Sequence, residues 1–200
     1  MKRQRALEIL RNLGGTITSK EAVEAGLQWR DLYDLRDEGL LIELSRGVYR
    51  LEEAEPTPYL DLLAVYRRCP HGTICLNSSL SFWDLTDEVP FEVHLAVPRG
   101  SWQPEISYPP TRVHVFSART FDLGRSLVEV GSDEEVAIYS PERSVVDAMR
   151  LRRRVGSDVA NGALRRYLSR PGASPANLLR LARALGTGGP MARALEVLTG

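Results

Sequence analysis

Hydrophobic residues recur at helical spacing over the first forty positions and at alternate positions over the next ten. A first helix is predicted over residues 2–13, because its apolar side chains repeat at i, i+3, i+4 and i+7. These side chains are Ala6, Ile9, Leu10 and Leu13. A short extended link is predicted at residues 16–18, with the Ile17 side chain in the core.

Two further helices and a hairpin follow. Ser19 is the predicted N-cap of the second helix, SKEAVEAGL, and the third helix runs from about Gln28 to Glu38. Residues 41–51 form two strands around a tight Ser45-Arg46-Gly47 turn. Three short helices and a two-stranded ribbon are typical of a winged helix-turn-helix, which we assign to residues 1–51.

The rest of the chain changes character. The stretch EEAEPTP, residues 52–58, is acidic and contains two prolines, so it predicts a linker. Residues 59–200 predict a mixed α/β domain with a small sheet over 91–139 and helices from Ser140 onward, the first reaching about Arg154. The predicted fold class is therefore α+β, a winged helix-turn-helix followed by a mixed α/β domain whose C-terminal part is helical.

Charge is balanced overall but uneven along the chain. Residues 1–50 hold nine Lys or Arg and eight Asp or Glu, residues 51–139 hold six and fourteen, and residues 140–200 hold eleven and four. An acidic middle and a basic tail indicate separate surfaces with separate partners, or one surface that neutralises the other.

Neither a membrane span nor a metal site is indicated. No apolar run approaches the ~20 residues that a spanning helix needs, and no cleavage site follows the basic N-terminus, so we expect a cytoplasmic protein. Cys69 and Cys75 bracket His71 in CPHGTIC, but a structural zinc site needs four ligands. We expect two reduced, partly buried thiols and no metal or other cofactor.

The common catalytic templates are missing from the sequence. It contains no Walker loop, no Gly-x-Ser-x-Gly elbow and no Gly-x-Gly-x-x-Gly after a strand. Ser78 and Ser79 begin an apolar helix, where serine is more often an N-cap than a nucleophile. We therefore expect no enzyme and no catalytic residue.

Polar and cationic residues lie where a winged helix faces DNA. Recognition helices usually read base edges near their N-terminal ends, where Arg favours guanine and Gln favours adenine. The wing tip suits a minor groove or a phosphate. The expected DNA-contacting residues are Lys2, Arg3, Lys20, Gln28, Trp29, Arg30, Tyr33 and Arg46.

The third helix is also acidic, which bears on DNA affinity. Asp31 lies in its first turn, where it stabilises the helix N-terminus, whereas Asp34 shares a face with Arg30. There Asp34 either holds Arg30 in position or accepts from a cytosine amino group. We expect weak non-specific binding, with cations of the wing and of the first helix supplying much of the affinity.

Three residues near this face also have structural interpretations. Trp29 packs under the wing in one of them, since tryptophan tends to be buried. Arg36 pairs with acids on its own helix, and Arg50 only solvates its strand.

Arginines dominate the C-terminal part. Cations at a helix C-terminus complement its dipole by ~0.3–1 kcal/mol each, but four in five residues exceed what capping needs. We expect a basic face that binds nucleic acid non-specifically, binds an acidic protein, or neutralises the acidic middle segment. The expected partner-binding residues are Arg150, Arg152, Arg153, Arg154, Arg165 and Arg166.

Three motifs in order carry a resemblance to a known family. They are SRGVYRL (45–51), SFWDLTDEVPFEVHLAVPRG (81–100) and YSPERSVVDAMR (139–150). Together they resemble the AbiEi-type antitoxins, transcriptional regulators of bacterial type IV toxin–antitoxin systems. The resemblance covers nearly the whole chain, although the third helix is more acidic than is typical of the family.

The resemblance implies a winged helix that binds inverted repeats in its own promoter and represses it. It implies a C-terminal domain that counteracts a nucleotidyltransferase-like toxin, and it carries the recognition positions onto Gln28, Arg30, Tyr33 and Arg46. The alternative is a protein-interaction module whose basic C-terminal helices bind an acidic partner without specific DNA binding. A palindromic operator would accept two copies, but no dimer interface is evident, so a monomer in solution is the working expectation.

Overall fold

The computed structural model describes the backbone of residues 2–131 and 133–199 and the side chains of residues 3–131 and 133–198. It divides into two compact units. Unit 1 comprises Met1–His71, Pro104–Thr111 and Leu127–Val136, and unit 2 comprises Gly72–Gln103, Arg112–Ser126 and Ala137–Gly200. The linker at residues 52–58 stays a prediction, because compactness alone does not define where a domain ends.

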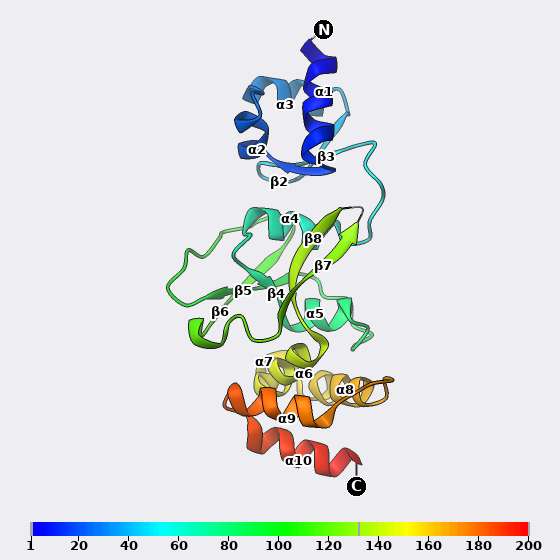
Figure 1. The fold of residues 1–200 in the computed structure, drawn as a ribbon, viewed down its shortest axis with the longest axis vertical. Coiled ribbons are helices and arrows are strands. Elements are labelled where there is room, and N and C mark those ends of the chain that lie inside the picture. The colour runs from blue at the N-terminus through cyan, green and yellow to red at the C-terminus, as the bar shows by residue number, and fades with distance from the viewer. Residues whose placement is uncertain (1, 132, 200) are drawn as a thin grey trace. The chain divides into compact units, whose positions relative to one another are not determined.

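Unit 1 begins with three short helices, α1 (Lys2–Leu13), α2 (Ser19–Glu24) and α3 (Trp29–Asp37) (Figure 1). Their apolar faces meet around Leu10 and Leu32, both fully buried. All three helices were predicted from the sequence, and all three are confirmed within a few residues.

The caps of these helices explain where they begin and end. Thr18 is the N-cap of α2, because its side chain accepts from the Glu21 N–H at 3.2 Å while the Glu21 carboxylate accepts from the Thr18 N–H at 2.6 Å. The prediction of Ser19 as N-cap was therefore wrong by one residue. Asp31 accepts from the Gln28 N–H at 2.8 Å, which confirms its predicted role at the start of α3.

A three-stranded antiparallel sheet completes the N-terminal part. Its order is β1 (Thr16–Thr18), β3 (Val48–Leu51), β2 (Leu41–Ser45), with Ile17 opposite Tyr49. The predicted extended link is thus a strand, and the predicted hairpin is confirmed. Helix α4 (Leu60–Arg68) packs on this sheet.

A second, mixed sheet has five strands in the order β6, β5, β4, β8, β7. Their bounds are β4 Thr73–Ile74, β5 Val93–Pro98, β6 Thr111–Phe116, β7 Arg125–Gly131 and β8 Glu134–Tyr139. Strand β4 pairs antiparallel with β5 and parallel with β8. A small mixed sheet over residues 91–139 was predicted, but β4 was missed, because two residues are too few to show alternation.

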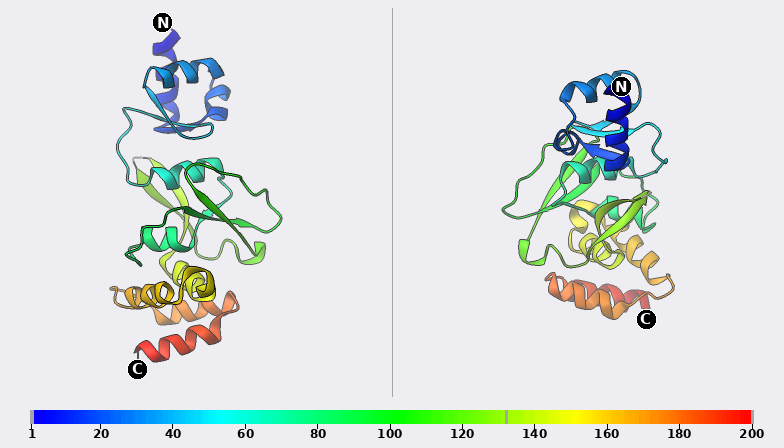
Figure 2. Two further views of the ribbon diagram at one scale, coloured as in Figure 1. Left: turned by 180° about the vertical axis from the view of Figure 1, so that it is seen from behind. Right: turned by 45° about the horizontal axis from the view of Figure 1, so that its top comes forward.

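Unit 2 also contains the remaining helices. They are α5 (Leu76–Phe82), α6 (Pro141–Arg150), α7 (Arg152–Val155), α8 (Ser157–Leu168), α9 (Pro175–Ala184) and α10 (Gly188–Thr199), with a 3₁₀ turn η1 at Ala118–Thr120. Helix α6 contacts α5, α8, α9 and α10. Figure 2 shows α9 and α10 on the outer side of α6 and α8. Their shared core includes Leu80, Val146, Leu164 and Leu178.

The starts of these helices were readable from sequence, but one end was not. The helix predicted from Ser140 onward begins there, because the Ser140 side chain accepts from the Arg143 N–H at 3.3 Å and Pro141 occupies the first helical position. The helix expected to reach Arg154 instead ends at Arg150. Leu151 leaves helical geometry, with φ −108° and ψ 23°, and α7 begins after it.

Candidate nucleic-acid interface

The outward face of α3 is polar and aromatic. Trp29 is 52% exposed and Tyr33 is 43% exposed, and Gln28 and Arg30 are exposed beside them. Trp29 therefore does not pack under the wing in the described structure. The buried residues of the helix, Leu32 and Leu35, hold this face outward through helical spacing.

The turn between β2 and β3 is held from several sides. Gly47 has φ +73°, a conformation that favours glycine, as its place in the predicted turn required. Its carbonyl accepts from the Ser19 N–H at 2.9 Å, and its N–H donates to Glu43 Oε1 at 3.3 Å. Arg46 at the tip is exposed. The turn is thus fixed in place while its cation stays accessible.

A hollow of about 600 Å³ lies between α3 and this turn. It is lined by Ser19, Trp29, Tyr33, Arg36, Glu43, Arg46, Gly47, Tyr49 and Arg68. A second hollow lies on the other side of the turn, and Ser19, Arg46, Gly47 and Arg68 line both. These four residues therefore form the ridge between the two hollows.

Several of the predicted cations have acidic neighbours. Arg3 Nε lies 3.0 Å from Glu38, Lys20 Nζ 3.8 Å from Glu24, and Arg30 Nε 3.9 Å from Asp34. Such exposed pairs are weak, but each partly neutralises a charge that would otherwise attract phosphate. By contrast, Arg46 meets no carboxylate within 4 Å among the described side chains. The side chain of Lys2 lies outside the described residues.

Arg36 is the most neutralised cation of this face. It donates to Asp37 on its own helix at 2.9 Å, as predicted, and to Glu43 on β2 at 3.3 Å. The hydrogen bond to Asp37, opposed by some desolvation, raises the pKa of the Arg36 guanidinium. Its guanidinium carbon also lies 5.1 Å from the centre of the Tyr33 ring, so Arg36 is occupied within the protein.

Arg50 was predicted only to solvate its strand, and this was wrong. Its side chain is buried and donates to Thr16 Oγ1 at 2.6 Å, to Glu134 Oε2 at 2.5 Å and to the Glu55 carbonyl at 2.5 Å. The acceptor Glu134 is far along the chain, so no local pattern could have indicated it.

Two arginines that the sequence did not mark lie beside the turn. Arg68 Nη1 donates to the Arg46 carbonyl at 3.0 Å, and Arg67 Nη1 lies 3.2 Å from Glu21 Oε1. The signal that could have found Arg68 is spacing, because Leu60, Ala64 and Arg68 lie four residues apart on α4. This spacing places Arg68 beside the turn only because Leu60 and Ala64 pack on the hairpin, and that packing is seen only in the structure.

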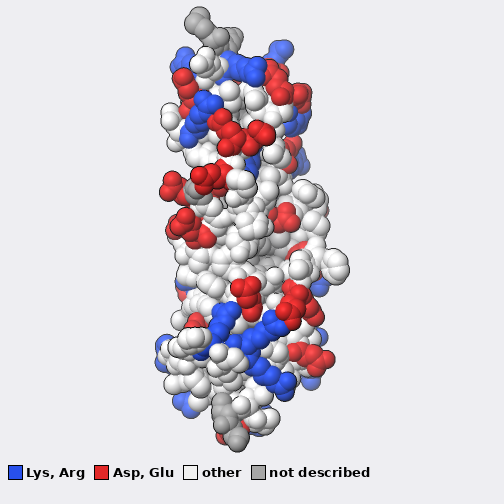
Figure 3. Space-filling view, turned by 90° about the vertical axis from the view of Figure 1, so that its right-hand side faces the viewer, with Lys and Arg blue, Asp and Glu red and all other residues white. Residues whose placement is uncertain are grey.

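The C-terminal arginines differ in their surroundings. Arg150 pairs with Asp147 at 2.8 Å, Arg166 pairs with Asp87, and Arg152 Nη1 donates to the Met149 carbonyl at 3.2 Å. On the face in Figure 3, basic and acidic side chains intermingle. The cations that stay exposed without a carboxylate within 4 Å, among the described side chains, include Arg153, Arg154 and Arg165.

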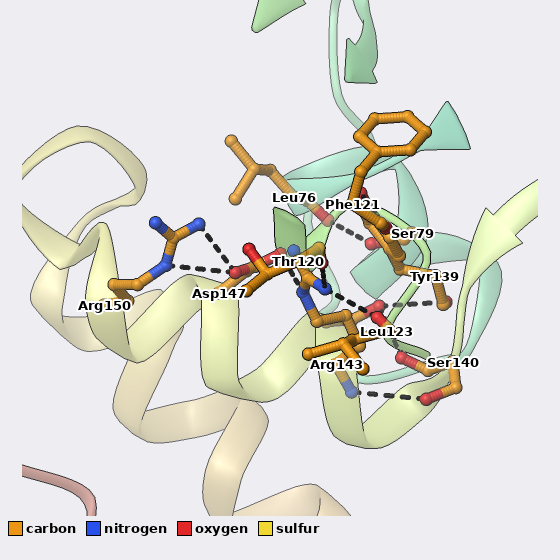
Figure 4. A network of polar contacts seen from close by, with 11 residues as sticks. Leu76, Ser79, Thr120, Phe121, Leu123, Tyr139, Ser140, Arg143, Asp147 and Arg150 are labelled. Carbon is orange, nitrogen blue, oxygen red and sulfur yellow. Dashed lines mark hydrogen bonds and ion pairs between the residues drawn. The ribbon is translucent and has the colours of Figure 1, made fainter. Parts of the chain in front are cut away.

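The motif YSPERSVVDAMR forms a buried polar network in unit 2 (Figure 4). Arg143 is 1% exposed and donates to Asp147 Oδ2 at 2.8 Å and to the carbonyls of Thr120 at 2.8 Å and Leu123 at 2.5 Å. Its guanidinium carbon lies 4.2 Å from the centre of the Tyr139 ring. The motif therefore fastens the segment around η1 to helix α6, which is a structural role.

The serines and cysteines have structural surroundings. The N-cap of α5 is Cys75, so Ser78 and Ser79 lie within the helix, and the prediction that they are N-caps was wrong. Ser78 Oγ accepts from the His94 N–H at 2.9 Å, and Ser79 Oγ donates to the Leu76 carbonyl at 2.9 Å. Burial raises the pKa of the Cys75 thiol, which disfavours a thiolate nucleophile.

Over residues 2–131 and 133–199, no group of three His, Cys, Asp or Glu residues is arranged to hold a metal ion. Cys69 and Cys75 are both buried, and Cys69 Sγ lies 3.5 Å from His71 Nε2. In the same residues no helix is long and apolar enough to cross a membrane.

Comparison with known proteins bears on the N-terminal part. Residues 4–52 match the family model described as "Transcriptional regulator, AbiEi antitoxin". The predicted resemblance is confirmed over this segment, which contains the first of the three motifs, SRGVYRL. No curated protein matches the sequence.

One solved structure is similar over most of the chain. It is the crystal structure of the RV2827C protein from Mycobacterium tuberculosis, with a TM-score of 0.53 and 18% sequence identity. The similarity covers 97% of this chain and 79% of that one. At this identity the comparison concerns the fold alone, which in this chain is mixed α+β with small sheets and helices.

Proposed function

We propose that this chain, whose residues 4–52 match the AbiEi antitoxin regulators, is a DNA-binding transcriptional regulator of the antitoxin type. In this proposal, residues 1–51 are a winged helix-turn-helix, residues 52–58 a linker and residues 59–200 the antitoxin or effector domain. Helix α3 is the recognition helix and the turn around Arg46 is the wing.

A single observation carries the proposal. The exposed face of α3, with Trp29 and Tyr33, lies beside an anchored turn that presents Arg46, and both line one hollow. A winged helix places a helix in the major groove and a turn on the adjacent backbone or minor groove, and the neighbouring positions of α3 and the turn support this assignment. Helix α3 and the turn both lie within the matched segment, residues 4–52.

The proposed contacts divide by chemistry. Gln28 and Arg30, at the N-terminal end of α3, are proposed to read base edges, and Tyr33 to meet a phosphate or a thymine methyl. Arg46 is proposed to bind backbone or minor groove, with Lys2, Arg3 and Lys20 as further phosphate cations. The acidic neighbours of Arg3, Lys20 and Arg30 support weak non-specific binding, as the acidity of α3 already indicated.

The DNA target and the antitoxin activity are proposed from the resemblance to the family. We propose that the chain binds inverted repeats in its own promoter and represses it, and that residues 59–200 counteract a nucleotidyltransferase-like toxin. Helices α7 and α8 are proposed to supply the contacts to that partner through Arg153, Arg154 and Arg165, since these side chains are exposed. Arg150, Arg152 and Arg166, predicted for the same surface, would have to exchange the contacts they make now.

Mobility shift of the chain on its own upstream region, over a salt series, tests the proposal. A complex is expected at low salt, where phosphate contacts dominate, and it should weaken as salt rises. Gln28→Ala with Arg30→Ala should reduce binding to the promoter more than to a random duplex of equal length. No complex at the lowest salt would overturn the proposal.

A second candidate function is favoured by the same exposed arginines. If the chain is a protein-interaction module, Arg153, Arg154 and Arg165 bind an acidic partner and α3 has no operator. Co-purification with the product of the neighbouring gene distinguishes the two. A stable complex lost in Arg153→Ala with Arg154→Ala, from a chain that gives no shift on promoter DNA, would favour this second function.

Neither function needs a catalytic residue. AbiEi regulators are generally not enzymes, and we propose none here. The surroundings of Ser78 and Ser79 support this, since both hydroxyls are buried and hydrogen-bonded to the protein backbone.

A further inference from the structure

The geometry of a winged helix constrains where a DNA strand must pass. The major and minor grooves of duplex DNA are separated by one sugar-phosphate backbone. A helix in the major groove and a wing at the adjacent minor groove therefore straddle that backbone. In this chain the surface between the two is the hollow between α3 and the Arg46 turn. Phosphates of the straddled strand should meet the residues that line it.

The cations of this hollow are not equivalent. Three arginines line it, namely Arg36, Arg46 and Arg68. Arg36 is held between Asp37 and Glu43, so its charge is already balanced within the protein. Arg46 is exposed at the tip of the turn. The third cation, Arg68, lies outside the segment matched by the family model.

Arg68 is tied to the turn but keeps donors to spare. Its Nη1 donates to the Arg46 carbonyl at 3.0 Å. Its Nε has no hydrogen-bond partner among the described residues but is shielded from solvent. The donors left for a ligand are therefore those of Nη2, for which no partner is found among the described residues. No carboxylate of the described chain lies within 4 Å of its guanidinium. Arg68 therefore combines a defined position with an unbalanced charge.

The packing of α4 explains this position. Leu60 and Ala64 belong to the apolar cluster that includes Leu44 and Val48 of the hairpin. Residues four apart lie on one face of a helix, so the next position on this face is Arg68. The last turn of α4 thus carries Arg68 to the ridge between the two hollows. A cation is also favoured there by the C-terminal end of the helix dipole.

We propose that Arg68 is a phosphate-binding residue for the DNA backbone strand that passes between α3 and the wing. This inference rests on the proposed function and extends the DNA interface beyond residues 4–52 to helix α4. The guanidinium suits a phosphate, since its Nη2 can donate to phosphate oxygens while Nη1 keeps its bond to the turn. Arg46 and Arg68 then flank the strand as the two unbalanced cations of the hollow.

Salt dependence of DNA binding tests the inference. The full chain and its variants are titrated against a duplex of its upstream region and a random duplex of equal length. Each lost phosphate contact lowers the slope of log K against log salt by about 0.9. Arg68→Gln removes the charge but keeps an amide donor for the Arg46 carbonyl. This variant is expected to reduce the magnitude of the slope by about 0.9. It should weaken binding to the promoter duplex and to the random duplex by the same factor.

Two further variants separate a phosphate contact from a structural role. Arg68→Lys keeps the charge and should restore most of the slope. Arg11→Gln removes one charge from the same unit, at an arginine that pairs with Glu53 and lines neither hollow, and should leave the slope unchanged. If Arg68 has only a structural role, Arg68→Gln should instead weaken binding to the promoter duplex more than binding to the random duplex.

The outcomes distinguish this inference from the proposed function. If the unaltered chain binds no DNA, both fail. If it binds DNA and Arg68→Gln keeps the full slope, or if Arg11→Gln lowers the slope as much, only the role of Arg68 is overturned. Circular dichroism of each variant ensures that folded proteins are compared.

Discussion

Arg50 on β3 donates to Glu134 on β8 at 2.5 Å, and both side chains are almost completely buried. The two residues are 84 positions apart in the chain. Arg50 also donates to Thr16 Oγ1 and to the Glu55 carbonyl, so most of its donors are used. Within unit 1 this pair ties the hairpin that carries the proposed wing to the segment Leu127–Val136.

Removing one partner of this pair should destabilise unit 1 strongly. A buried charge left without its partner costs about 3–5 kcal/mol, because neither water nor another group replaces the contact. Arg50→Ala is expected to lower the free energy of unfolding in urea by about this amount. Arg11→Ala, which breaks an exposed pair with Glu53, should leave the midpoint nearly unchanged. Equal midpoints for Arg50→Ala and the unaltered chain would contradict the assignment.

The wing turn should not tolerate a side chain at Gly47. A Cβ there would lie 3.0 Å from Ser19 Oγ, and φ +73° costs an L-residue about 1–2 kcal/mol. Gly47→Ala is expected to lower stability by about that amount and to weaken DNA binding by displacing Arg46. Gly162→Ala, within α8 where a Cβ meets open space, should instead stabilise the protein by about 0.5–1 kcal/mol. Unchanged stability in Gly47→Ala would show that the turn adapts.

The Arg143–Asp147 network should govern the stability of unit 2. Asp147 accepts from Arg143 at 2.8 Å and from Arg150 at 2.8 Å, and it is fully buried. Asp147→Ala leaves the Arg143 charge buried without a carboxylate, so a loss of about 3–5 kcal/mol is expected. Arg150→Ala should cost less, because Arg150 is partly exposed. Thermal unfolding followed by circular dichroism compares the two, and a larger loss in Arg150→Ala would count against this account.

Two stacked histidines predict a pH dependence of stability. His94 Nδ1 lies 3.0 Å from His114 Nε2 on the adjacent strand. Burial, followed by the charges of His94, Arg112 and Arg154, lowers the pKa of His114 to about 4. Between about pH 6.5 and 4 the unfolded chain therefore binds a proton that the folded chain does not.

The contribution of His114 to stability is thus complete above about pH 6.5 and is lost as the pH falls towards 4. Urea midpoints measured from pH 7.5 downward should fall across this window. Glutamine does not titrate, so the urea midpoint of the His114→Gln variant should fall less steeply with pH than that of the unaltered chain. Parallel curves for the two proteins would mean that other groups dominate.

Asp34 should limit DNA affinity while sharpening its specificity. Its carboxylate lies on the exposed face of α3, 3.9 Å from Arg30. Asp34→Asn removes a negative charge that repels phosphate, so binding to a random duplex at low salt should strengthen. If Asp34 also positions Arg30, the preference for the promoter duplex should shrink. Asp61→Asn makes the same change on α4 away from both hollows and should alter neither quantity.

Much of the local structure could be read from the sequence, because it depends on neighbours in the chain. Helical spacing located α1 and α3, and the start of α6 lies at the predicted Ser140. The errors were also local in origin. Thr18 and Ser19 are equally good caps by residue type, and only the reciprocal bonds with Glu21 decide between them. The end of α6 at Arg150 has no marker such as glycine or proline.

Only part of the candidate site could be predicted from the sequence. Its polar positions on α3 and at the turn follow from periodicity, since the buried leucines fix which residues face outward. Periodicity does not show which cations lack a nearby carboxylate. Arg3 meets Glu38 because α1 packs beside α3, and Arg36 meets Glu43 because α3 packs beside β2. Each of these contacts joins separate elements, so spacing along one element cannot reveal it.

The order of the elements, the acidic outward face of α3 and the resemblance carried by the three motifs could be read from the sequence, because each depends on residues close in the chain. The surroundings of individual charges could be seen only in the folded structure. It buried Arg50 against Glu134, and it brought Arg68 to the carbonyl of Arg46. The physical reason is that the free energy of a charge depends on the groups within a few ångströms of it, and folding chooses those groups from anywhere in the chain.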